Sequence, residues 1–85
     1  MPIISQFFGI NIYMFWTDHA PPHFHAIYGG EKVSMNIETG EVDGKMTKRA
    51  INLINEWRLL HIEELRYDWS LASSRSALNE IQPLE

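Results

Sequence analysis

Hydrophobic residues recur at every second position near the start of the chain, which is the period typical of β-strands. One face of this predicted strand carries four apolar side chains, Ile10, Ile12, Met14 and Trp16. Because Tyr13 and Phe15 lie on the other face, we expect the strand to be covered on both sides. Residues 3–8 predict a shorter strand before it, and Gly9 predicts a bulge or bend between the two.

Paired prolines and paired glycines divide the next segment into a loop and a hairpin. Pro21-Pro22 favours an extended path and ends on a residue without an N–H, so the next strand, residues 23–28, begins directly after it or lies at an edge. Gly29-Gly30 predicts a two-residue hairpin turn. The return strand, residues 31–38, has two distinct faces, with Val33, Met35 and Ile37 inward and Ser34 and Asn36 outward. A short segment around Val42 follows.

The second half of the chain has helical spacing. Thr47 can cap a helix that starts at Lys48. Its apolar stripe recurs at intervals of three and four: Ala50, Leu53, Ile54, Trp57, Leu60, His61, Leu65, Trp69 and Ala72. One long helix is the simplest interpretation, a break near Asp68 would give two, and residues 81–84 can add a last short strand. The sequence predicts an α+β fold in which a small antiparallel β-meander of three to four strands packs on one long or broken C-terminal helix.

Length and composition limit the kinds of protein that this chain can be. Its 85 residues predict a single domain, residues 1–85, and the absence of cysteine excludes disulfides and thiolate metal sites. No apolar run reaches the roughly 20 residues of a membrane span, and no signal peptide is recognisable, so we expect a cytoplasmic protein. The net charge of −4 argues against a surface that grips nucleic-acid backbone non-specifically.

Three of the four histidines fall within seven residues, directly after an aspartate. His23 and His25 are two positions apart, so on a strand they point to the same face, with Cα atoms roughly 6.6 Å apart. Two imidazoles at this spacing can chelate one ion, with Asp18 or His19 as a third ligand from the rigid loop. Such a set of histidine and carboxylate ligands suits a divalent metal such as zinc or iron(II).

The same pair also suits metal-free acid–base catalysis, because imidazole titrates near neutral pH. Here His23 and His25 would be catalytic, and Asp18 and His19 would orient them. RNA is a candidate substrate because its own 2′-hydroxyl can supply the nucleophile. Donors for its phosphate would come from nearby basic residues, Lys32, Lys45, Lys48 and Arg49.

Each of these residues also has an ordinary structural role. Histidines beside aromatic residues on a strand often only pack or form hydrogen bonds, and an aspartate before a turn commonly bonds to nearby backbone. We expect His61, on the helical stripe, to be a satisfied core histidine. Trp57 and Trp69 are expected to anchor a core or an interface.

The segment Asp18-His19-Ala20-Pro21-Pro22-His23-Phe24-His25, with Tyr28-Gly29 after it, resembles a family of small bacterial and archaeal proteins known as domain of unknown function 4160. The resemblance covers nearly the whole chain, including Pro2-Ile3-Ile4-Ser5, Phe8-Gly9-Ile10, Glu56-Trp57, Leu60-His61, Glu64-Leu65 and Trp69. The family signature falls on Asp18, His19, Pro21, Pro22, His23 and His25.

The resemblance implies a stand-alone cytoplasmic protein, in many cases encoded beside another small protein, which would be its partner. Some members carry the label of toxin in a toxin–antitoxin pair. The family often has a basic side chain where this sequence has Tyr13, and its absence weakens the nuclease hypothesis here.

Two functions from different classes therefore stay open. The leading hypothesis is a toxin-like protein that acts on RNA through the histidine cluster, as an enzyme with or without a metal. The alternative is a non-catalytic module that binds a metal, a partner or a second copy of itself, with structural histidines.

Overall fold

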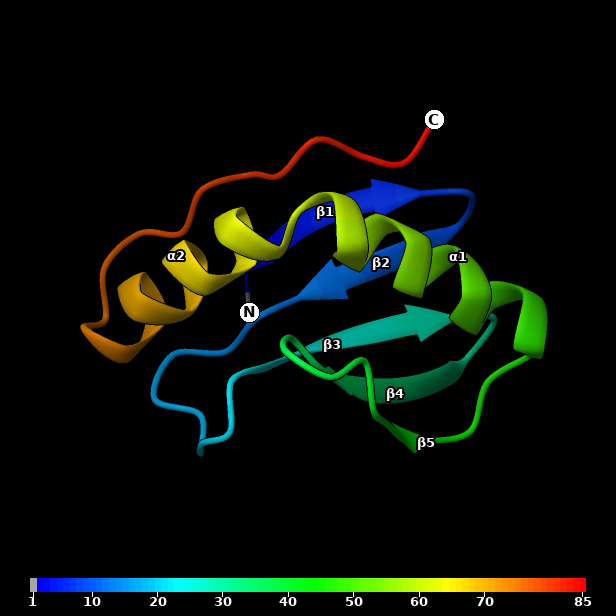
Figure 1. Cartoon of the computed structure of the whole chain (residues 1–85), viewed down its shortest axis with the longest axis horizontal. Helices are drawn as coiled ribbons and strands as arrows, with labels where there is room; N and C mark the ends of the chain where they lie inside the picture. The colour runs from blue at the N-terminus through cyan, green and yellow to red at the C-terminus, as the bar shows by residue number, and fades with distance from the viewer. Residues whose placement is uncertain (1) are drawn as a thin grey trace.

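A five-stranded antiparallel sheet occupies the first half of the chain in the computed structural model, which describes residues 2–85 (Figure 1). Its strands are β1 (Ile3–Phe7), β2 (Ile10–Tyr13), β3 (His23–Tyr28), β4 (Glu31–Asn36) and β5 (Val42–Gly44). Each strand pairs with its predecessor, so the predicted meander is confirmed. The predicted three to four strands are too few, because the short segments at both edges also form ladders.

Two helices follow, α1 (Lys48–Leu60) and α2 (Ile62–Ser73), and Thr47 caps the first by accepting the Ala50 N–H at 3.3 Å. The prediction of one long helix is therefore wrong. The helix is broken at His61 rather than near Asp68. The His61 N–H bonds to the Arg58 carbonyl at 3.1 Å, three residues back, which ends the α-helical hydrogen-bond pattern.

Both helices lie on the same side of the sheet, and the core fills the space between the two layers (Figure 1). Trp57 of α1 is fully buried at the centre, where its ring centroid lies 5.5 Å from those of Phe7 and Phe24. The inward residues predicted for the strands, Ile10, Ile12, Met14, Val33, Met35 and Ile37, are all buried. Burial of such side chains contributes about 1.5–3 kcal/mol each to stability.

The opposite face of the sheet has no second layer of helix or strand within residues 2–85. The expectation that both faces would be covered is therefore wrong, and Tyr13 and Phe15 are only partly buried there. Trp16, which was expected to point inward, is 45% exposed, because β2 ends at Tyr13 and the chain turns at Thr17 (φ 58°). This open face carries the candidate site.

The C-terminal tail passes α2 and runs beside the β1 edge of the sheet without forming the expected strand (Figure 1). Its Ile81 N–H donates to the Ile4 carbonyl at 2.7 Å, and the Gln82 carbonyl accepts the Trp57 indole N–H at 2.9 Å. Ile81 and Leu84 are buried against the core. Among the described residues, neither helix has the length and hydropathy that would allow it to cross a lipid bilayer.

Candidate metal centre

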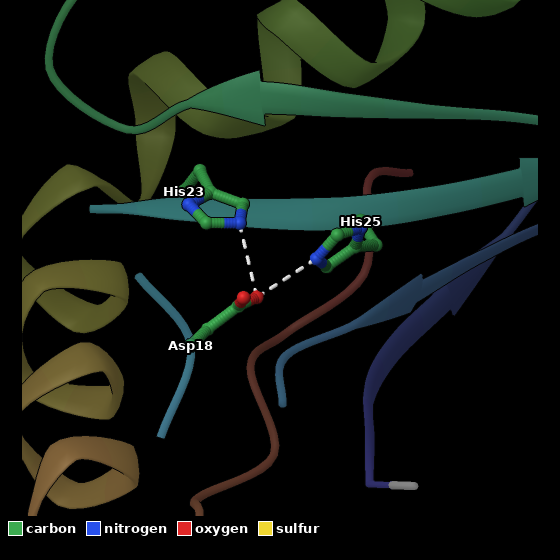
Figure 2. Close-up of side chains that lie close together, drawn as sticks. All are labelled: Asp18, His23 and His25. Atoms are coloured by element: carbon green, nitrogen blue, oxygen red, sulfur yellow. Dashed lines mark hydrogen bonds and ion pairs between the residues drawn. The ribbon is translucent and has the colours of Figure 1, made fainter. Parts of the chain in front are cut away.

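Two histidines of β3 and one aspartate of the preceding loop converge on the open face of the sheet (Figure 2). Alternation along β3 directs His23 and His25 to the same side, as predicted. Asp18 places its Oδ2 atom 3.0 Å from Nε2 of His23 and 2.9 Å from Nε2 of His25. One potential ligand atom from each residue lies within 4.8 Å of the other two.

The backbone sets the orientation of the His23 ring. Its Nδ1 lies 2.8 Å from the carbonyl oxygen of Pro21, and a carbonyl only accepts hydrogen bonds, so Nδ1 carries the proton. In the neutral ring, Nε2 therefore presents a lone pair to the Asp18 carboxylate. Two acceptors at 3.0 Å repel each other unless a proton or a metal cation lies between them. This pattern, in which the second nitrogen bonds to a carbonyl, is common among metal-binding histidines.

Asp18 is an anion at neutral pH. Partial burial opposes its ionisation, but the hydrogen bond with His25, the charge of His23 and the backbone N–H of His19 outweigh this effect. Together they lower the pKa of the Asp18 carboxyl below its usual value. The carboxyl thus has two roles, since Oδ1 accepts the neighbouring His19 N–H at 3.2 Å while Oδ2 faces the histidines.

Aromatic rings support both imidazoles from the side. The Phe15 ring meets His25 edge-on at 4.5 Å between centroids, and the Trp69 ring of α2 lies 5.4 Å from His23. The side chains of His23, Asp18 and His25 are still 18%, 22% and 29% exposed, so an ion from solvent can reach them. Neither contact was predicted, because Phe15 was expected only to cover a strand face and Trp69 only to anchor a core or an interface.

An open groove of about 500 Å³ adjoins the cluster and extends toward β5. Its polar lining continues from Asp18 and His23 through Ser34, Asn36, Glu41 and Asp43. None of these four residues was predicted to belong to the site, although the two-residue turn at Gly29-Gly30 indicates that Ser34 and Asn36 lie beside the histidines. That turn fixes the register in which His25 pairs with Ser34 and His23 pairs with Asn36.

The fourth predicted site residue is not part of the cluster. The imidazole of His19 lies outside the three-ligand group, and His19 contributes its backbone N–H and part of the groove wall. The predicted phosphate donors, Lys32, Lys45, Lys48 and Arg49, do not line the groove either. Arg49 instead borders a cavity of about 40 Å³ beside Tyr28, at the other end of β3.

His61 forms a hydrogen bond, as predicted, but it is only partly buried and is not one of the core residues. Its Nδ1 lies 2.6 Å from a carboxylate oxygen of Glu64, and its ring packs near Trp57 at 5.7 Å. It thus supplies a second histidine–carboxylate pair outside the candidate site.

Comparison with known proteins identifies a family but no activity. Residues 9–70 match the model of the family described as domain of unknown function (DUF4160). No curated protein and no solved structure matches the chain. The toxin label suggested by the resemblance stays a prediction.

Proposed function

The chain belongs to the DUF4160 family. We propose that this protein binds a divalent transition metal through Asp18, His23 and His25. The ion would be of the zinc type, with its open side toward the groove. The observation that carries this proposal is the convergence of two imidazole Nε2 atoms on one carboxylate oxygen, at 3.0 and 2.9 Å.

The arrangement needs little change to accommodate such an ion. Zinc bonds to histidine nitrogen at about 2.0–2.1 Å and to carboxylate oxygen at about 2.0–2.2 Å, which places neighbouring tetrahedral ligands about 3.3 Å apart. The nitrogen–oxygen distances here would increase by a few tenths of an ångström. The hydrogen bond between His23 Nδ1 and the Pro21 carbonyl already fixes the ring in the tautomer that a metal requires.

Three protein ligands leave at least one coordination position for an outside ligand. With an ion bound, the site would supply a Lewis acid of the kind that catalytic zinc sites use. The chain would orient the ligands through Pro21, flank them with Phe15 and Trp69, and admit the outside ligand through the groove.

The charge of the groove favours a neutral or cationic ligand on the open side. Asp18, Glu41 and Asp43 contribute three carboxylates to the lining, and no lysine or arginine does. A phosphodiester approaching this surface would be repelled, because like charges in a partly enclosed groove interact more strongly than in water. This distribution supports metal binding with a non-phosphate ligand more than it supports hydrolysis of RNA.

Titration of the metal-free protein with Zn(II), followed by isothermal calorimetry, tests the proposal. We expect one site per chain in the wild type and no saturable site in His23→Ala. His61→Ala is the matched control, because it removes a histidine that also pairs with a carboxylate. Equal binding by wild type and His23→Ala would refute the proposed site. Absence of binding to Zn(II) and Fe(II) by the wild type would leave metal-free acid–base chemistry or structural histidines.

A further inference from the structure

We infer that Trp16 is a positioning residue for the metal site, because its indole N–H holds the Asp18 loop against the end of α2. This inference rests on the proposed function. Asp18 is the only ligand in the proposed set that comes from a loop, since both histidines are held in β3 by its neighbouring strands.

Two hydrogen bonds join this loop to a segment far along the chain. The Trp16 indole Nε1–H donates to the Ser76 carbonyl at 2.9 Å, and the Thr17 backbone N–H donates to the Ala72 carbonyl at 3.4 Å. Asp18 follows directly after these two anchors. At the far end of the loop, the Pro22 carbonyl accepts the Ile37 N–H at 3.0 Å.

Packing alone does not explain the position of Trp16. Its side chain is 45% exposed, and a surface hollow of about 360 Å³ lies beside Trp16, Thr17 and Arg75. Because nearly half of the residue is exposed, the indole hydrogen bond is a specific attachment that packing does not supply. The shorter of the two anchoring bonds, at 2.9 Å, is the one that Trp16 forms.

Helix α2 also supports the other half of the site. Its Trp69 ring lies 5.4 Å from the His23 ring, while its last turn and the residues after it receive the bonds from the Asp18 loop. One helix therefore contacts both the Asp18 loop and the His23 ring. Metal affinity depends on ligand positions within about 0.5 Å, so loss of the Trp16 bond should weaken binding.

Trp57 provides a matched control. Its indole N–H also donates to a carbonyl of the C-terminal segment, that of Gln82, at the same 2.9 Å. The bond lies on the helical side of the sheet, away from Asp18. Substitution by phenylalanine at either position removes one indole donor and keeps an aromatic ring.

The experiment compares Trp16→Phe and Trp57→Phe with the wild type in metal affinity and in metal-free melting temperature. We expect Trp16→Phe to weaken Zn(II) binding about 10–100-fold, the usual effect of removing an outer support of a metal ligand. Loss of the indole hydrogen bond should lower the metal-free melting temperature by about 4–8 °C, because one such bond contributes about 1 kcal/mol. Trp57→Phe should lower the melting temperature more and leave the affinity unchanged. The visible absorption of bound Co(II), which reports coordination geometry, should change only in Trp16→Phe.

Different outcomes would refute the role of Trp16 and the metal site itself. If the wild type binds metal and Trp16→Phe binds within two-fold of it, the inference is wrong and the metal site stands. If both variants lose affinity in proportion to their stability, Trp16 is merely structural. A wild type that binds no metal overturns both.

Discussion

Replacing Asp18 by asparagine tests the charge at the centre of the cluster. The amide has nearly the size of the carboxyl, and its oxygen can still accept a hydrogen bond from Nε2 of His25, which now lies 2.9 Å from Asp18 Oδ2. Since the side chain is 22% exposed and one acceptor is retained, we expect the metal-free protein to lose only about 1 kcal/mol. The fold should therefore survive the change.

Metal affinity should respond much more strongly, because an amide oxygen carries no charge. Removing a residue that only holds a metal ligand in place lowers metal affinity about 10–100-fold. Loss of a charged residue that binds the metal directly should therefore lower it about 100-fold or more. At a Zn(II) concentration 100 times the wild-type Kd, binding stabilises the wild type by about 2.7 kcal/mol. The same concentration would stabilise Asp18→Asn by only about 0.4 kcal/mol.

Thermal unfolding measured with and without metal converts these energies into temperatures. For a domain of this size, 1 kcal/mol shifts the melting temperature by about 4–8 °C. We expect Zn(II) to raise it by about 11–22 °C in the wild type and by about 2–3 °C in Asp18→Asn. Excess chelator should reverse both shifts. Equal shifts in the two proteins would refute a direct role for the Asp18 carboxylate.

The remaining predictions concern the fold. Burial raises the pKa of the Asp68 carboxyl, whose Oδ1 accepts the Asn79 N–H at 2.9 Å while Oδ2 has no partner among the described residues. Folding therefore favours the neutral form of the Asp68 carboxyl. The stability that this carboxyl contributes is present below its pKa in the unfolded chain, and it is lost as pH rises through its pKa in the folded protein. In urea unfolding from pH 3 to 8, the free energy of unfolding of Asp68→Asn should increase relative to that of the wild type as pH rises. Gly40→Ala should destabilise the folded protein by about 1–3 kcal/mol, because φ at Gly40 is 77° and a Cβ there would lie 2.7 Å from Nη2 of the buried Arg58. An unchanged urea midpoint would contradict this prediction. Ile54→Ala, at a fully buried position of α1, should cost about 2–5 kcal/mol by the same assay.

Local patterns in the sequence determined most of the secondary structure. The strand period placed His23 and His25 on one face, and the Gly29-Gly30 turn fixed how β3 pairs with β4. The Thr47 cap identified the start of α1. These predictions succeeded because period, turn type and capping depend on residues only a few positions apart.

Tertiary packing decided the parts of the fold that those patterns left open. The apolar stripe continued through His61, so the break between α1 and α2 was invisible in the spacing. The apolar residues on both faces of the strand around Tyr13 predicted that both faces would be covered, which is wrong. The helices cover one face alone, and this leaves the cluster accessible to solvent.

The candidate site shows the same division between sequence and structure. The sequence by itself determined the histidine pair, because residues two positions apart on one strand share a face. It did not distinguish Asp18 from His19 as the third group, since both belong to a loop whose path depends on distant contacts. The bond from Trp16 to Ser76 spans 60 residues, and only the packed structure determines which loop side chain meets the histidines.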